Sequence, residues 1–259
     1  MRAATAFIHT SAKIHPSVHI GHSAFIDADV ELGEGTIVKP FAMITGHTKI
    51  GKFNTIFSYA SIGEAPQDVS YQGEPTRLEI GDHNIFREGV TVHRGTVKGG
   101  GVTQIGHHNF FLAYSHVGHD CVVGDHNTIV NFVAFSGHVS VGDFVLLSAY
   151  SGIHQFTSVG SYAMVAHAAI VTQDVPPFVL VAGGDSPYTV GLNVRGLKRR
   201  GFSEPELQAL KRLYKIYYRS DLSQAAALAE IEAEILPICP RAQIFIDFVH
   251  RSQRGVLRK

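Results

Sequence analysis

Two histidines and an aspartate stand close together near the middle of the chain, in the stretch SHVGHDCVVG from Ser115 to Gly124. His116 and His119 are three residues apart, and Asp120 follows His119 directly. A histidine with a pKa near neutrality is the usual general base for removing a hydroxyl proton, and a carboxylate can orient its imidazole. The pattern predicts that His119 is a general base, with Asp120 either holding the ring or binding a substrate hydroxyl.

An apolar residue recurs at every sixth position on both sides of this stretch. The series runs from Ile8 to Ile62, restarts from Ile80 to Val92, and continues from Ile105 to Val171. Gly often follows the apolar residue, and Asp, Asn and His occupy the next positions. An amphipathic helix repeats at 3.6 residues and a half-buried strand at two, so a period of six indicates one short strand and one turn per unit. Such a unit, repeated, predicts a solenoid.

This repeat resembles that of the hexapeptide-repeat transferases. The resemblance implies an all-β solenoid, a left-handed parallel β-helix with three hexads in each triangular coil. The left hand depends on the resemblance alone, because parallel crossovers are generally right-handed. The length of the repeat region predicts about eight coils, each adding roughly 4.8 Å along the axis.

Three hexads per coil place residues that are 18 positions apart one above the other. His119 then lies beneath Gly137, Gly137 beneath Gln155, and Asp120 beneath His138. Acyl transfer needs a donor to the developing oxyanion, and the unobstructed N–H of Gly137, one coil above the base, suits that role. No Ser or Cys nucleophile is required, because a substrate hydroxyl can attack a thioester directly. We therefore predict His119, Asp120 and Gly137 as the catalytic residues.

Two interruptions of the hexads predict loops on one face of the solenoid, where insertions often serve function. The first covers residues 64–78 and the second residues 93–104. Within the second, Lys98 to Gly101 lacks the Gly-Lys-Ser/Thr ending of a phosphate-binding loop and the helix pattern that follows it. We expect a flexible loop there.

The hexad repeat ends after Val171, and helical patterns follow. Pro176 and Pro177 cannot continue regular strand pairing. Ser203 and Glu206 form the pattern of a capping box, and apolar residues at helical spacing follow them. Further helices are expected over residues 223–236 and 240–251. The prediction is a β-helix over residues 1–190 and a small α-helical domain over residues 191–259.

The composition is that of a globular protein, with 45% hydrophobic residues. No apolar run is long enough for a membrane span, and the first residues lack the apolar centre of a secretory signal. We therefore predict a cytoplasmic protein without a transmembrane segment. Cys121 and Cys239 lie far apart without CxxC spacing, which argues against a disulfide framework or a cysteine metal site.

The net charge is zero, but the charge is divided unevenly along the chain. Lys and Arg exceed Asp and Glu over residues 192–259, and the reverse holds over residues 1–191. A basic C-terminal segment suggests an acidic partner or a phosphorylated ligand. Nucleic acid also fits this charge, but no zinc-finger, helix-turn-helix or aromatic RNA-binding signature accompanies it, so we expect no nucleic-acid partner.

A metal site is the sharpest alternative from another class. His116, His119 and His138 together offer three nitrogen ligands for zinc, as occurs at subunit contacts in carbonic anhydrases of the same fold. A zinc lyase and a non-catalytic scaffold are therefore the alternatives that are not transferases. The basic, tyrosine-containing tail is more than a zinc lyase requires, so we predict no metal.

Longer strings narrow the resemblance: GEPTRLEIGD, TVHRGTVKGGG, SHVGHDCVVG, SGHVSVGDF, HQF, QDVPP and GLKRRGFS. Over nearly the whole chain they resemble the UDP-N-acetylglucosamine O-acyltransferases, which catalyse the first step of lipid A synthesis. GEPTR, HRGT and GLKRRGF are the most specific of them. The resemblance implies a cytoplasmic homotrimer with active sites between subunits and no cofactor. Its reaction transfers a 3-hydroxyacyl group from acyl carrier protein to the 3-position of the sugar.

The resemblance also implies roles for single residues. His119 is the base, Asp120 supports it and Gly137 offers the oxyanion N–H. Asp68 contacts the sugar, and Asn193 contacts the uracil. The full set of implied substrate-binding residues, from sugar and acyl chain to nucleotide, phosphate and carrier protein, is Asp68, Ser70, His93, His116, His138, His154, Gln155, Asn193, Arg195, Arg199 and Arg200.

Three positions depart from the pattern of this family. Ser70 occupies the place of a Lys, and Arg195 replaces an acidic residue near the uracil contact. The lost Lys leaves open a 3-amino sugar as acceptor, which would give an amide. His167 stands where members that accept long chains keep a small residue, which predicts an acyl chain shorter than fourteen carbons. The nearest enzyme alternatives are the related N-acyltransferase and a coenzyme-A-dependent sugar acetyltransferase.

Overall fold

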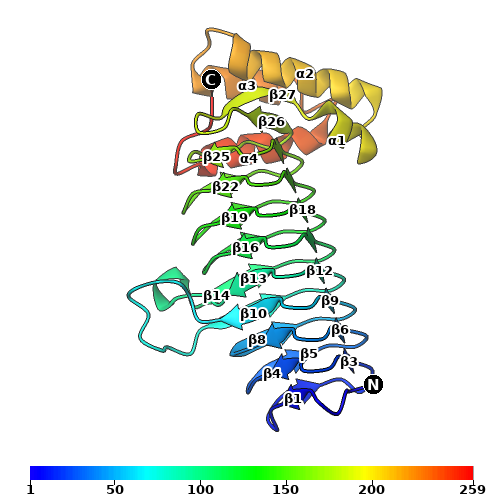
Figure 1. Cartoon of the computed structure of the whole chain (residues 1–259). Coiled ribbons are helices and arrows are strands. Elements are labelled where there is room, and N and C mark those ends of the chain that lie inside the picture. Colours follow the sequence, from blue (N-terminus) through cyan, green and yellow to red (C-terminus); the bar gives the residue numbers. More distant parts are fainter. Residues whose placement is uncertain (259) are drawn as a thin grey trace.

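The structure, a computed structural model, describes residues 1–258 and has two parts along one axis (Figure 1). Short β-strands stack as the coils of a left-handed parallel β-helix. Helices cover the C-terminal end of this β-helix, and the N-terminus lies at its other end (Figure 1). The fold predicted from the hexads is confirmed.

Three sheets form the faces of the β-helix, and over residues 1–258 they contain nine, eight and ten strands. The nine-stranded sheet consists of β1 Phe7–Ile8, β4 Phe25–Ile26, β7 Met43–Ile44, β10 Ser61–Glu64, β13 Thr91–His93, β16 His116–Val117, β19 Ala134–Phe135, β22 Gly152–Ile153 and β25 Ile170–Val171. The eight-stranded sheet consists of β2 Lys13–Ile14, β5 Val30–Leu32, β8 His47–Ile50, β11 Arg77–Ile80, β14 Val102–Ile105, β17 Val122–Val123, β20 Ser140–Val141 and β23 Ser158–Val159. The ten-stranded sheet consists of β3 His19–Ile20, β6 Ile37–Val38, β9 Thr55–Ile56, β12 Ile85–Phe86, β15 Phe110–Phe111, β18 Thr128–Ile129, β21 Leu146–Leu147, β24 Met164–Val165, β26 Val179–Ala182 and β27 Tyr188–Leu192.

The repeated apolar residues point inward and stack along the axis. Ile44, Phe111 and Phe135 are fully buried, whereas Ile8 in the first coil is only partly buried. Burying one such side chain contributes about 1.5–3 kcal/mol, so the stack is the main source of stability. The hexad spacing therefore sets which residues face the core and which remain at the surface.

A residue with positive φ recurs at the corners between sheets. Tyr114, Asp120, His126, Phe132 and His138 have φ values of 61°, 60°, 58°, 60° and 61°. Residues other than glycine rarely adopt this left-handed region. Phe and Tyr nevertheless hold most of these positions, and His, Asp, Ser and Ala hold the others. From Tyr114 to Tyr162 every sixth residue has this conformation, so each of these coils presents one such side chain at each corner, in line with the corner residues above and below.

Both insertions leave the β-helix at one corner, between the nine-stranded and the eight-stranded sheet. The first connects β10 to β11 and the second connects β13 to β14. They project from the same side of the β-helix (Figure 1). The expectation of a flexible loop over Lys98 to Gly101 is wrong for its first part, because η1 Val97–Gly99 is a 3-10 helix capped by the Thr96 side chain.

The C-terminal part contains α1 Val194–Arg199, α2 Glu204–Arg219, α3 Gln224–Glu234, η2 Pro240–Ala242 and α4 Gln243–Arg251. The capping box of Ser203 and Glu206 is present at the start of α2. Two features were not expected: the short helix α1, and β27, which pairs antiparallel with β26 after the two prolines. Within residues 1–258, no helix has the length and apolarity that a bilayer crossing demands.

Candidate active site

Successive turns at one corner of the β-helix carry the residues that spacing predicted to stack. The turn after β16 holds His119 and Asp120, the turn after β19 holds Gly137 and His138, and the turn after β22 holds Gln155. The His138 N–H donates to the His119 carbonyl at 2.9 Å, as expected for residues one coil apart. This corner also carries both insertions, so the catalytic candidates and the loops lie on the same edge.

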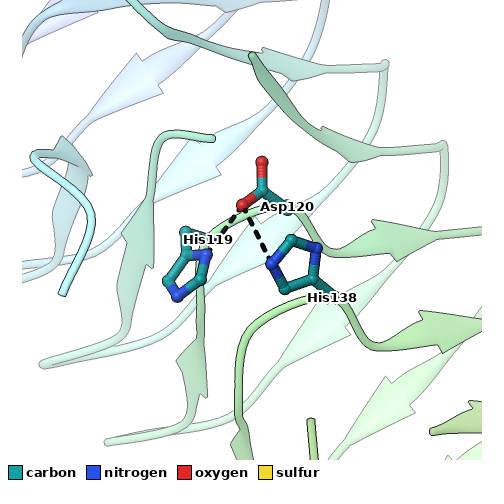
Figure 2. A group of neighbouring side chains, drawn as sticks. All are labelled: His119, Asp120 and His138. Atoms are coloured by element: carbon teal, nitrogen blue, oxygen red, sulfur yellow. Dashed lines mark hydrogen bonds and ion pairs between the residues drawn. The ribbon is translucent and has the colours of Figure 1, made fainter. Parts of the chain in front are cut away.

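His119 and Asp120 form a hydrogen-bonded pair (Figure 2). His119 Nδ1 lies 2.7 Å from Asp120 Oδ2, and the two side chains are 15% and 1% exposed. An ionised carboxylate only accepts hydrogen bonds, so Nδ1 carries the proton and Nε2 is left as the basic nitrogen. Of the two roles left open for Asp120, this geometry favours holding the ring, since a nearly buried carboxylate is poorly accessible to a substrate hydroxyl.

Gly137 lies directly against the imidazole. A Cβ atom at Gly137 would fall 2.6 Å from His119 Nε2, closer than van der Waals contact allows. Among the described residues, no acceptor takes the hydrogen of the Gly137 N–H. A free N–H on the residue that packs against the imidazole can donate to an oxygen of a molecule that reacts there.

Three more histidines surround the pair. His138 Nε2 lies 3.5 Å from Asp120 Oδ2, and its ring stands edge-on to His119 at 5.2 Å between centroids. Burial lowers the pKa of His138. Burial, with help from His93 and His119, lowers the pKa of His116 to about 4, and burial also lowers that of His93. These three rings are therefore neutral near pH 7 and act as polar, uncharged surface.

The metal alternative can be compared with the same distances. His119, Asp120 and His138 offer ligand atoms that all lie within 4.8 Å of one another, and His116 is not one of the three. Two ligand atoms on one tetrahedral zinc would be roughly 3.3 Å apart, since each bond is about 2.0 Å long. The 2.7 Å separation of His119 and Asp120 is that of a hydrogen bond. The arrangement thus suits a base and its carboxylate better than a zinc site.

Residues 174–257 match the family model described as Udp N-acetylglucosamine O-acyltransferase, Domain 2. The whole chain is similar to LpxA from Acinetobacter baumannii, with 42% identity, a TM-score of 0.96 and 99% of each chain covered. It is also 42% identical to the Francisella novicida UDP-N-acetylglucosamine acyltransferase, with a TM-score of 0.95 over 100% of this chain and 94% of that chain. This chain belongs to the UDP-N-acetylglucosamine acyltransferases. Bacteroides fragilis LpxA, a further member, is 36% identical, with a TM-score of 0.95 over 100% of both chains.

Within this acyltransferase, the first insertion carries Asp68 and Ser70. The Asp68 carboxylate accepts hydrogen bonds from the Ser70 N–H and hydroxyl, both at 2.8 Å, and these bonds lower its pKa. Lys98 Nζ donates to Ser70 Oγ at 2.9 Å. Lys98 belongs to η1, next to Thr96, and Thr96 binds Asp120, so this bond links the first insertion to the His119–Asp120 pair.

His93 and His116 lie one coil apart on the nine-stranded sheet, below the pair. His116 Nδ1 is hydrogen-bonded to Thr91 Oγ1 at 2.8 Å, while the buried Nδ1 of His93 has no partner within residues 1–258. His154 and Gln155 are exposed at the upper end of the corner, and the Arg254 guanidinium lies 3.3 Å from His154 Nδ1. These residues, too, belong to the corner of His119.

The remaining candidates lie at other corners. Arg200 stacks over Phe144 at 4.8 Å, at the corner between the eight-stranded and the ten-stranded sheet. Arg195 and Arg199 are exposed on the same short helix α1. Asn193 caps that helix by accepting from the Gly196 N–H, and it donates to the Tyr162 carbonyl. One chain therefore does not bring these four residues to His119.

His167 lies at the third corner, where its ring stands edge-on to Tyr150 at 5.5 Å. The turn that carries it leads into β25 of the nine-stranded sheet. It is separated from His119 by the width of that sheet and by two further coils.

Sequence reasoning missed the side chains that hold the predicted ones. Thr96 and Thr103 bind Asp120, Thr91 binds His116, and Lys98 binds Ser70. Thr96 belongs to the quoted string TVHRGTVKGGG, but a threonine in a loop gives no sign of which carboxylate it will meet. The one signal in the sequence is that the second insertion interrupts the hexads just before the histidine stretch, so its polar residues are candidates for contacts with that stretch.

Proposed function

We propose that this acyltransferase transfers a 3-hydroxyacyl group from the thioester of acyl carrier protein to the 3-position of UDP-N-acetylglucosamine. Membership of the family supports the reaction type and the substrates. The observation that carries the proposal is the His119–Asp120 pair with Gly137, whose N–H has no acceptor among the described residues, packed against the imidazole. No cofactor is required, because the thioester itself is the activated acyl donor.

In the proposed mechanism, His119 Nε2 removes the proton of the sugar hydroxyl as its oxygen attacks the thioester carbonyl carbon. The carbonyl oxygen becomes an oxyanion and accepts a hydrogen bond from the Gly137 N–H. Collapse of this intermediate re-forms the C=O bond and breaks the C–S bond. The departing thiolate takes the proton from the imidazolium, which restores neutral His119. Asp120 stabilises the imidazolium while it exists, through the bond to Nδ1.

The nine-stranded sheet offers a path for the acyl chain. His116, Ala134, Gly152 and Ile170 are neighbours in register on its outer face. Small and apolar side chains above His116 leave room for hydrocarbon and lose little solvation when it binds. His167 lies in the turn before β25, near the end of this face, which supports a chain shorter than fourteen carbons.

The nucleotide half of the site is proposed to need a second copy of the chain. His154 and Gln155 share a corner with His119. Arg195 and Arg199 of α1, together with its cap residues Asn193 and Arg200, lie at a different corner. A homotrimer in which one chain's α1 faces its neighbour's histidine corner would unite the two sets. Arg199 and Arg200 would then bind phosphate or carrier protein. Cytoplasmic location stays a prediction from the sequence.

The decisive experiment is an acyl-transfer assay on the purified protein. UDP-N-acetylglucosamine and its 3-amino analogue are each paired with 3-hydroxyacyl carrier proteins of several chain lengths and, separately, with acetyl coenzyme A. We expect ester formation with the natural sugar and a maximum below fourteen carbons. His119→Ala should lower kcat by roughly 10²- to 10⁴-fold, as expected for loss of a general base.

The matched control is His22→Ala, which removes an exposed turn histidine from the first coils. It should retain the parental rate. Retention of activity to within a few-fold in His119→Ala would refute the mechanism, and exclusive use of the 3-amino sugar would replace the ester product by an amide. Stoichiometric zinc in the purified protein would instead favour the lyase alternative.

A further inference from the structure

The Asp120 carboxylate receives two short hydrogen bonds from the second insertion. The Thr96 N–H donates to Asp120 Oδ1 at 2.7 Å, and the Thr96 hydroxyl donates to Oδ2 at 2.7 Å. Thr96 is 4% exposed. The two residues are 24 positions apart in sequence, so only the path of the loop brings them together.

Asp120 Oδ2 is shared between two donors. It accepts the hydroxyl hydrogen of Thr96, and the same oxygen binds Nδ1 of His119 at 2.7 Å. Each donor to a buried carboxylate stabilises part of its negative charge, so less remains to stabilise a neighbouring cation. The Thr96 hydroxyl thereby weakens the hold of Asp120 on the imidazolium form of His119.

Thr96 itself has little freedom to move. Its hydroxyl accepts from the Gly99 N–H at 3.2 Å and so caps η1. Gly99 packs so closely that a Cβ atom there would fall 2.5 Å from Asp120 Oδ2, which only glycine avoids. At the other end of the loop, Thr103 Oγ1 accepts from the Asp120 N–H at 2.8 Å. The second insertion therefore contacts Asp120 through Thr96, Gly99 and Thr103.

We propose that Thr96 is a positioning residue that fixes the Asp120 carboxylate and, through it, sets the orientation and the proton affinity of the His119 imidazole. The second insertion is then part of the catalytic apparatus, although Thr96 does not touch the substrate. This inference rests on the proposed role of His119 as the base.

Other charged or titratable groups also face this site and would influence the same proton. Besides Asp120, they are His138 from the turn after β19, His116 from β16, His93 from β13, Asp68 from the first insertion and Lys98 from η1. A Thr96 variant leaves all of them in place. A change in the pKa of His119 on substitution of Thr96 alone is therefore assignable to the shared carboxylate.

Thr96→Val is the informative variant, because valine has nearly the shape of threonine and lacks the hydroxyl. Without the hydroxyl of Thr96 as a donor, Asp120 Oδ2 stabilises the imidazolium form of His119 more strongly. The pKa of His119 should therefore rise by about 0.5 to 1 unit. The acid limb of the kcat/KM profile should move to higher pH by the same amount. Because the Asp120 carboxylate is less firmly held in Thr96→Val, the His119 ring is less well oriented, and kcat should fall roughly 10- to 100-fold. KM should change less than about twofold.

Two controls separate positioning from general destabilisation. Thr96→Ser keeps both bonds and should restore the parental pKa and rate. Thr36→Val removes a buried hydroxyl that donates to the Gly51 carbonyl in a lower coil, so it should reduce thermal stability without moving the pKa of His119. If Thr96→Val does not fold, Thr96→Ala serves in its place.

The pKa of His119 is read by NMR titration of the full-length protein with ¹³Cε1-labelled histidine, and its resonance is assigned by its absence in His119→Ala. This readout needs no turnover, so it distinguishes failure of the Thr96 proposal from failure of the proposed reaction. An unchanged or lowered pKa in Thr96→Val would overturn the proposal, as would kcat within twofold of the parental value. A raised pKa with lowered kcat, restored by Thr96→Ser, is the result that the proposal requires.

Discussion

At the scale of single residues, backbone geometry does much of the positioning. Asp120 occupies a left-handed corner position with φ of 60°, and its hydrogen bonds to Thr96 and His119 hold its carboxylate inside instead of out in solvent. Gly137 lies one coil above without a side chain, because the imidazole fills the space that a Cβ atom would need. Two corner positions in successive coils thus contact the His119 imidazole, Asp120 through a hydrogen bond and Gly137 through close packing.

Gly137→Ala tests this close approach. The substitution leaves the backbone N–H in place, but the new methyl group must displace the His119 ring. We therefore expect kcat to fall by roughly 10²-fold. The free energy of unfolding should change by less than about 1 kcal/mol. Steady-state kinetics and chemical denaturation measure the two quantities. Gly191→Ala is the control, since a Cβ atom there meets nothing within 4 Å. A fully active Gly137→Ala enzyme would show that the ring can move without cost.

At the scale of elements, the two insertions act as one assembly at the histidine corner. Lys98 from η1 donates to Ser70 of the first insertion, and Ser70 in turn donates to the Asp68 carboxylate. Arg94 adds a bond to the Tyr71 hydroxyl at 3.2 Å. Because both loops leave the β-helix at the same corner, these contacts can hold the proposed sugar-binding Asp68 next to the base.

Lys98→Met removes the ammonium group and keeps the length of the side chain. An exposed contact of this kind contributes less than about 1 kcal/mol to stability, so the melting temperature should barely change. The first insertion should become less ordered, and KM for the UDP-sugar should rise about three- to tenfold with kcat nearly constant. Lys52→Met, which removes a surface pair with Glu34 far from the insertions, is the matched control. An unaltered KM in Lys98→Met would show that Lys98 does not contribute to binding of the UDP-sugar.

At the scale of the whole molecule, the triangular cross-section separates groups that the proposed reaction needs together. His119 and Arg200 lie at different corners, and Arg200 is held over Phe144 rather than near the base. The contact surfaces of a cyclic trimer are heterologous. The corner of His119 in one chain can therefore face the corner of Arg200 in the next chain. This arrangement is the structural argument for the proposed homotrimer.

Mixing two inactive variants tests whether the sites lie between subunits. His119→Ala keeps Arg200, and Arg200→Ala keeps His119, so neither trimer alone has a complete site. In trimers co-assembled from equal amounts, about one site in four combines an intact His119 with a neighbour's intact Arg200, and roughly a quarter of parental activity should return. Activity that stays at the level of the separate variants would place both residues in one chain's site.

The sequence by itself determined the fold and the stacked corner. A strict period of six fixes which residues enter the core, and residues one coil apart must then stack, so His119, Gly137 and Gln155 followed from counting. The hexad pattern carries this information because each coil pairs only with its neighbours. The capping box before α2 was predicted equally well, since it depends on residues three apart.

Only the tertiary structure decided which side chains hold the His119–Asp120 pair and at which corner the α1 residues lie. Thr96, Lys98 and Arg254 reach their partners through loops and a tail whose paths obey no repeat, so sequence distance says nothing about contact. The corner of Arg200 depends on how the helices pack onto the last coil. Local periodicity places His119, Gly137 and Gln155 at one corner of one chain. Non-local packing adds the contacts of Thr96 to Asp120 and places Arg200 at another corner, and on these two facts the proposals for Thr96 and for the homotrimer rest.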